Sequence, residues 1–206
     1  MSGTTYGGLD GNYNYGDGDI FLVKYNSSGV KQWTKQLGTS SYDSGYGVTV
    51  DSSNNIYVTG STQGGLDGNT NSGKSDIILV KYNSSGVKQW TKQLGTSSHE
   101  TGYWDPITVD SSNNIYVTGY TYGGLDGNTF FGGGGDIFLV KYNSNGTKQW
   151  TRQLGTSEQD LGYGVTVDSS DNIYLTGITS GSLDGNTNSG NSDIFLVKYN
   201  SDGVLQ

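Results

Sequence analysis

Cysteine and alanine are absent from this chain of 206 residues, and proline and histidine occur once each. Without cysteine there is no disulfide framework, no thiol nucleophile and no thiolate metal site. With His99 as the single histidine, no nucleophile, base and orienting partner can be assembled, so we expect no enzyme activity. No apolar run approaches the roughly 20 residues that a membrane-spanning helix needs, which argues against membrane insertion.

Positive charge is scarce as well, because 11 lysines and arginines face 19 aspartates and glutamates, for a formal net charge of −8. Such a surface repels phosphate backbones and anionic lipid, so we expect neither nucleic acid nor membrane as a partner. What the chain has in abundance is glycine, with 35 residues, and tyrosine, with 16. Threonine, valine and isoleucine recur in short runs separated by the turn formers Gly, Asn, Ser and Asp. Composition therefore indicates short strands joined by turns.

The chain is built of repeats. The segment Asp-Ile-Phe-Leu-Val-Lys-Tyr begins at Asp19 and returns, with small changes, at spacings of 57, 60 and 57 residues at Asp76, Asp136 and Asp193. Leu-Asp-Gly-Asn occurs four times, beginning at Leu9, Leu66, Leu125 and Leu183. Self-similarity at such a period is typical of architectures in which each unit packs on its neighbours. No linker interrupts the pattern, so we expect one domain, residues 1–206.

Each unit holds four strand-like runs, seen in full at 46–51, 56–62, 76–82 and 87–94. Short polar turns between them imply antiparallel hairpins. In the third run, Ile77 and Leu79 lie on one face while Ile78, Val80 and Tyr82 lie on the other, so both faces are expected to be covered. The expected fold is an all-β propeller of about 3.5 four-stranded blades with 14 strands. Its units are a partial blade at 1–38, blades at 39–95 and 96–155, and a partial blade at 156–206.

The second unit resembles the bacterial SBBP repeat, a family named for seven-bladed β-propellers. The residues that carry the resemblance are Gly45–Asp51, Asn55–Gly60 and Asp76–Tyr82, in register and repeated along essentially the whole chain. The resemblance implies an extracellular or cell-surface module with an adhesive or scaffolding role, and it implies no catalytic residues. Met1 leads directly into Ser2-Gly3, so we expect no signal peptide in this chain and, for an exported protein, a signal upstream of it.

The long connection between the second and third runs is the strongest candidate for a metal site. It carries oxygen side chains at alternate positions, with glycines that let the loop turn, which resembles the start of a calcium loop. The candidate ligands are Asp10, Asn12, Asn14 and Asp19 in the first copy, Asp67, Asn69, Asn71 and Asp76 in the second, and Asp184, Asn186, Asn188 and Asp193 in the fourth.

The alternative is that Asp, Asn and Gly form Asx-turns in a long hairpin connection. It is supported by the glycine standing one place late for an EF-hand and by the lack of a closing glutamate. The copy at Asp126 is the weakest calcium candidate, since Phe130 replaces the second asparagine and Gly132–Gly135 follow. No other cofactor is expected.

The third unit breaks the symmetry with two extra residues in Tyr103-Trp104-Asp105-Pro106-Ile107. Trp104 is a candidate for stacking on a sugar at the rim of the expected channel, with a tolerated bulge as the alternative. We interpret His99 as a solvated loop residue. The aspartates that recur after the inner strand are interpreted as turn caps, and the recurring tryptophans as packing between blades: Asp51, Asp110, Asp168, Trp33, Trp90 and Trp150.

Three functions stay open. The preferred one is a non-catalytic surface module for protein binding or scaffolding, the second is a carbohydrate-binding lectin, and the third is an engineered or truncated fragment with no function of its own. An isolated arc exposes an apolar blade face at each end, so we expect the chain to bind a second copy head-to-tail. Fourteen strands per chain favour a seven-bladed dimeric ring, with an eight-bladed dimer as a serious alternative and a filament as a lesser one.

Overall fold

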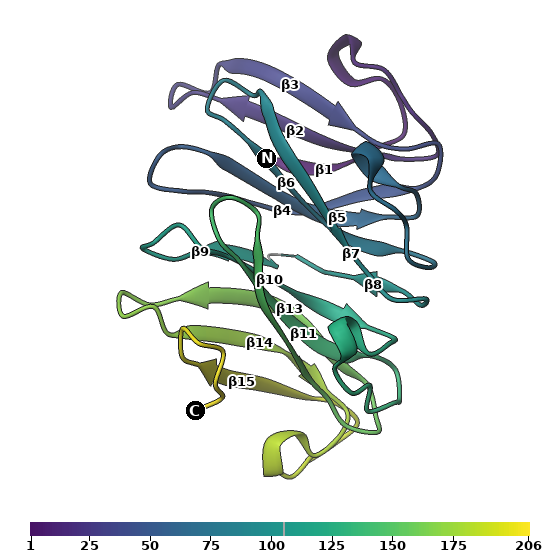
Figure 1. The fold of residues 1–206 in the computed structure, drawn as a ribbon, viewed down its shortest axis with the longest axis vertical. Helices are drawn as coiled ribbons and strands as arrows, with labels where there is room; N and C mark the ends of the chain where they lie inside the picture. The colour runs from purple at the N-terminus through teal and green to yellow at the C-terminus, as the bar shows by residue number, and fades with distance from the viewer. Residues whose placement is uncertain (105) are drawn as a thin grey trace.

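The structure, a computed structural model, describes residues 1–104 and 106–206. Within these residues the chain forms four antiparallel sheets that follow one another along the sequence (Figure 1). The first sheet contains β1 (Ser2–Thr5), β2 (Asp19–Tyr25) and β3 (Lys31–Leu37). The second contains β4 (Asp43–Val50), β5 (Ile56–Thr62), β6 (Asp76–Tyr82) and β7 (Lys88–Leu94).

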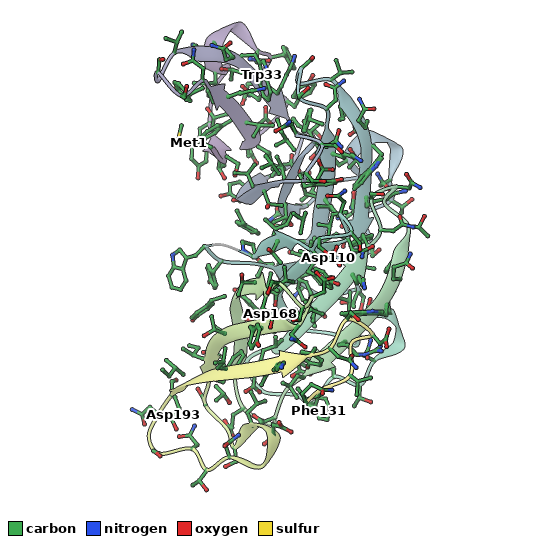
Figure 2. The ribbon with its side chains drawn as sticks, turned by 90° about the vertical axis from the view of Figure 1, so that its left-hand side faces the viewer. Met1, Trp33, Asp110, Phe131, Asp168 and Asp193 are labelled. Atoms are coloured by element: carbon green, nitrogen blue, oxygen red, sulfur yellow. The ribbon has the colours of Figure 1, made fainter. Side chains whose placement is uncertain are left out.

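The third sheet contains β8 (Glu100–Thr101), β9 (Ile107–Val109), β10 (Ile115–Thr121), β11 (Asp136–Tyr142) and β12 (Lys148–Leu154). The fourth contains β13 (Asp160–Val167), β14 (Ile173–Thr179) and β15 (Asp193–Tyr199). Seen from the side, the four sheets form an open arc (Figure 2). The all-β architecture of partial propeller blades is therefore confirmed, as an arc and not as a closed ring.

Four connections contain a three-residue 3-10 turn: those from β1 to β2, from β5 to β6, from β10 to β11 and from β14 to β15. These turns are η1 (Leu9–Gly11), η2 (Leu66–Gly68), η3 (Leu125–Gly127) and η4 (Leu183–Gly185). In the part of the chain that the structure describes, no helix is long and apolar enough to cross a membrane.

The expected runs at 56–62 and 76–82 coincide with β5 and β6, whereas the inner strand of the third sheet departs from expectation. It splits into β8 and β9, which both pair with β10, so the described residues form 15 strands where 14 were expected. Trp104 has φ +47°, and Pro106 has no N–H to give to the ladder. Pairing resumes where Thr118 N donates to Pro106 O at 2.9 Å. Asp105 lies outside the described residues.

The hydrophobic core consists of three layers, one in each junction between neighbouring sheets. Between the second and third sheets, Ile77 and Leu79 pack with Phe138, Val140 and Tyr142. The same five positions recur in the first junction, where Ile20 and Leu22 meet Ile78, Val80 and Tyr82. The two faces of β6 thus belong to two different layers, as the pattern of its apolar residues predicts.

Each tryptophan of the outer strand packs across a junction, as expected from its recurrence. A Cβ built on Gly86, in the turn before β7, would lie 2.9 Å from the ring of Trp33 of the first sheet. The same relation holds for Gly146 with Trp90 and for Gly203 with Trp150. Lysines add hydrogen bonds across the same junctions, since Lys24 Nζ donates to Ser84 O at 2.7 Å and Lys81 Nζ to Ser144 O at 2.9 Å.

Candidate functional site

The aspartate of the Leu-Asp-Gly-Asn connection pairs with the outer strand of its own sheet. Asp67 adopts a left-handed backbone conformation, with φ +52°, and Gly68 follows with φ +82°. In this conformation the Asp67 carboxylate accepts hydrogen bonds from Lys88 Nζ and Thr91 Oγ1, both on β7. Equivalent contacts join Asp10 to Lys31 and Thr34, and Asp126 to Lys148 and Thr151.

The other candidate ligands of the second loop have partners elsewhere. Asn69 Nδ2 donates to Leu66 O at 2.8 Å, and Asn71 Nδ2 donates to Gln63 O and Gly73 O, each at 2.9 Å. Asp76 Oδ2 accepts from Ser72 N at 2.8 Å and from Gln93 Nε2 at 2.9 Å. These contacts favour the turn interpretation of the loops over the calcium interpretation.

The corresponding residues of the first loop behave alike: Asn12 Nδ2 donates to Leu9 O, Asn14 Nδ2 to Gly16 O, and Asp19 Oδ2 accepts from Tyr15 N. In the fourth loop Asn186 Nδ2 also donates to Leu183 O, at 3.2 Å, and Asp193 Oδ2 accepts from Ser189 N at 2.6 Å. There Asp184, Asn186, Asn188 and Asp193 line one pocket of about 220 Å³ beside the open face of β15. Among the described residues, no group of three or more His, Cys, Asp or Glu side chains could hold a metal ion.

The aspartates after the inner strand cap turns, as predicted. Asp51 Oδ1 accepts from Ser53 N at 2.9 Å and Asn55 N at 2.8 Å, and its Oδ2 accepts from Tyr57 Oη at 2.9 Å. Asp110 and Asp168 make the same set of contacts. The hydrogen bond from the Asn172 side chain, reinforced by the Asn172 and Ser170 amides, lowers the pKa of Asp168 to about 2.

Pairs of buried carboxyl groups, which sequence reasoning missed, lie at the three junctions. A Cβ built on Gly95 would be 2.0 Å from Asp76 Oδ1 and 2.9 Å from Glu100 Oε2, so both acids crowd the same glycine. Asp19 with Asp43 and Asp136 with Asp160 occupy the equivalent positions, and all six side chains are fully buried. Burial, assisted by the neighbouring acid, raises the pKa of Asp43 and of Asp136.

In each pair, the acid that comes first in the sequence has one oxygen without a hydrogen-bond partner: Oδ1 of Asp19, Asp76 and Asp136. The second acid of each pair is bound by threonines: Glu100 accepts from Thr96 N at 2.6 Å and from Thr121 Oγ1 at 2.7 Å, although in the first pair Asp43 Oδ1 also lacks a partner. An unpartnered buried oxygen costs about 1–3 kcal/mol. The pairs therefore lie where neighbouring sheets meet, and burying them costs electrostatic free energy that depends on pH.

A polar pocket of about 480 Å³ opens between the second and third sheets. Tyr46 lies in its wall, with its hydroxyl 2.6 Å from Ser61 Oγ and 2.8 Å from Thr101 Oγ1. His99, interpreted from sequence as a solvated loop residue, is half-buried in the pocket lining, with Nδ1 3.1 Å from Ser75 Oγ.

The Ser75 and His99 pair has the residue types of a nucleophile and its base. However, Ser75 is buried, and its hydroxyl also donates to Glu100 O at 3.1 Å. A hydroxyl proton committed to a carbonyl is not available to the imidazole, so the geometry supports hydrogen bonding in the pocket wall and not activation of a nucleophile.

Trp104, the candidate ligand-stacking residue, is 73% exposed and belongs to a chain of aromatic contacts. Its ring lies 4.7 Å from that of Tyr163 and 5.9 Å from that of Tyr103. Tyr103 in turn stacks on Tyr120, which lines the polar pocket, at 5.4 Å. The structure therefore connects Trp104 with the pocket through one continuous aromatic cluster.

Comparison with known proteins agrees with this fold. The family described as SBBP, beta-propeller repeat, matches residues 32–67, 89–126 and 149–184, which together are more than half of the chain. A solved structure of a protein of unknown function from Bacteroides caccae has a TM-score of 0.51 with 8% identity, over 91% of this chain and 55% of that one. That likeness shows the fold alone.

Two curated relatives are each 28% identical to this chain. The uncharacterized WD repeat-containing protein L264 of Acanthamoeba polyphaga mimivirus aligns with 82% of the chain, and the regulatory protein FlaEY of Caulobacter vibrioides with 75%. The chain spans only 15% and 18% of the length of these relatives. With the family match over three successive repeats, the chain belongs to the SBBP β-propeller repeat family.

Proposed function

We propose that the chain is a non-catalytic binding and scaffold module whose two terminal sheets pair with those of a second copy. The observation that carries this proposal is the exposure of the outer face of β15. Ile194 and Leu196 are 88% and 72% exposed, whereas Ile77 and Leu79, at the same positions of β6, are 4% and 1% exposed. Residues that form a core layer in every interior junction are therefore uncovered in the last sheet.

The first sheet presents the complementary half of such a layer. In interior junctions, the face that receives the isoleucine and leucine carries the positions of Ile78, Val80 and Tyr82. In the first sheet, Tyr25 occupies the position of Tyr82 and is 48% exposed, against 5% for Tyr82. Val23, at the position of Val80, is by contrast buried, at 5% exposure. The uncovered part of this face is therefore its end at Tyr25, and the proposed contact, between two different faces, is head-to-tail.

Burial of a side chain such as Ile194 or Leu196 stabilises an interface by about 1.5–3 kcal/mol. Each terminal sheet is a separate blade in the arc, so two copies would bring eight sheets together. This count supports the eight-bladed dimeric ring over the seven-bladed one. A head-to-tail contact that does not close would give a filament instead.

Substitution of the open face tests the proposal. Leu196→Lys and Ile194→Lys should each convert the assembly to a monomer, because a buried ammonium without a partner is costly. Val87→Lys is the matched control, since Val87 is 56% exposed in the turn before β7, where its exposure has no connection with a missing neighbour. Light scattering coupled to size exclusion gives the mass, and an unchanged mass for both face variants would remove the proposal.

The family membership also motivates an extracellular or cell-surface location, which we propose on that ground. Fractionation of source cells with an antibody against this chain tests it. Recovery in the cytosolic fraction alone would contradict it.

A further inference from the structure

The polar pocket between the second and third sheets is lined by residues that distinguish the copies from one another. Its lining includes Tyr42, Gln63, Lys74, His99 and Tyr122. Tyr46 keeps its residue type in the other inner strands, as Tyr103 and Tyr163, and Ser75, Ser98 and Tyr122 each recur in one other copy, as Ser192, Ser41 and Tyr6. The repeats are otherwise nearly identical, as in Lys-Gln-Trp-Thr-Lys-Gln-Leu of β3 and β7.

The substitutions between copies change the chemistry of these positions. Gln63 is replaced by Tyr122 in the third copy and by Ser180 in the fourth, and Lys74 is replaced by Asp17, Gly134 and Asn191. Positions that differ between the copies therefore line this surface, so the surface distinguishes one unit from another. At the junction between the second and third sheets this surface forms a pocket of about 480 Å³, a volume within the range of small-molecule sites.

The lining of the pocket is rich in hydroxyl-bearing side chains. Hydroxyl, amide and imidazole groups of Ser61, Gln63 and His99 supply both donors and acceptors. Among the described residues, no carboxylate lines the pocket, although the chain carries a net charge of −8, and Lys74 is the one lysine or arginine in the lining. A ligand rich in hydroxyl groups satisfies such a lining better than a phosphate, which needs several cations.

Aromatic rings continue from the pocket along the third copy. His99 lies edge-on to Tyr122 at 6.4 Å, Tyr122 lies edge-on to Tyr120 at 5.8 Å, and Tyr120 stacks on Tyr103. Tyr122, Tyr103 and Trp104 are 39%, 44% and 73% exposed, while Tyr120 is buried beneath them. Trp104 holds φ +47°, a conformation that costs a bulky residue free energy and that is found at ligand sites.

We propose that this pocket and the exposed rings of Tyr103 and Trp104 bind a carbohydrate. One sugar ring occupies the pocket, with its hydroxyl groups on Gln63 and His99 and its apolar face on Tyr122. Further sugar units extend over Tyr103 and Trp104. The site deepens the binding part of the proposed function and lies within one chain, so it does not depend on assembly.

The test uses saturation-transfer NMR with glucose, galactose, N-acetylglucosamine and glucuronate, and with the trisaccharides maltotriose and chitotriose. Saturation of the protein should reach the ring protons of at least one of these sugars. Gln63→Ala and Tyr122→Ser should each weaken its binding about tenfold or more. Tyr122→Ser installs the residue that the fourth copy carries at this position, Ser180, so the scaffold is suited to it.

Gln159→Ala is the matched control, because Gln159 holds the position of His99 in the next junction. It should leave binding unchanged, and Trp104→Ala should weaken a trisaccharide more than a monosaccharide. Leu196→Lys should bind as the parent chain does, which separates this proposal from head-to-tail pairing. Absence of transfer to all six sugars, or equal binding by the Tyr122→Ser and Gln159→Ala variants, would overturn the proposal.

Discussion

Gly86 lies against the indole of Trp33, and a Cβ at position 86 would come within 2.9 Å of the ring. The pair joins the first sheet to the second, and the same pair recurs at the two following junctions. Gly29 occupies the corresponding turn of the first sheet with nearly the same φ, +74° against +76°, but nothing lies within 4 Å of its added Cβ.

This difference predicts the outcome of two alanine substitutions. Gly86→Ala and Gly29→Ala both cost about 1–2 kcal/mol for a left-handed conformation. Only Gly86→Ala adds the cost of overpacking against Trp33, about 1–3 kcal/mol. Urea unfolding should therefore show the larger loss for Gly86→Ala. Equal losses for the two variants would mean that packing of Trp33 across the junction contributes nothing measurable.

The buried acid pair Asp136 and Asp160 predicts a pH dependence of stability. Burial raises the pKa of Asp136, so in the window between the unfolded and the folded pKa the folded state binds more protons. The contribution of this group to stability is therefore full below the unfolded pKa, near 4, and is lost as pH rises through the folded pKa.

Asp136→Asn removes the buried charge and keeps an oxygen for Phe131 N and Gln153 Nε2, the two donors to Asp136 Oδ2. At neutral pH the melting temperature should rise, by about 2–4 °C for each kcal/mol gained, and at pH 3 the variant and the parent should melt together. Asp193→Asn is the control, because Asp193 is only half-buried in the last sheet. A lower melting temperature for Asp136→Asn at neutral pH would contradict this account.

Much of the fold could be predicted from sequence because its determinants are local. Alternation of apolar residues in β6 showed that both faces are buried, and the strand bounds 56–62 and 76–82 matched. The split of the inner strand into β8 and β9 required knowing how Trp104 and Pro106 interrupt a ladder. Length alone indicated an insertion there, but not the loss of pairing.

The site residues were harder to predict because their partners come from other strands and sheets. Asp67 carries the residue type of a calcium ligand, yet it binds Lys88 and Thr91, which are 21 and 24 residues away. Asp76 and Glu100 meet only because two sheets stack. For the polar pocket a signal was present, since comparing the copies with one another marks Gln63 and His99 as divergent positions.

The hydrogen bonds that Lys88 and Thr91 donate to the Asp67 carboxylate predict how the chain responds to calcium. With the carboxylate accepting from Lys88 and Thr91, millimolar calcium or a chelator should leave the melting temperature unchanged, because a ligand stabilises only when it binds the folded state. Lys88→Ala, which removes an exposed ion pair, should cost less than about 1 kcal/mol. A calcium-dependent rise in melting temperature that Asp67→Asn abolishes would instead establish these loops as metal sites.

The central claim is that the faces of the first and last sheets cover each other in a second copy. Sedimentation velocity of the parent chain over the micromolar range measures this most directly. The account predicts a particle of about 44 kDa, twice the 21.9 kDa of one chain, that persists on dilution. A folded particle of 21.9 kDa at every concentration would contradict it, since Ile194 and Leu196 would then stay exposed in solution.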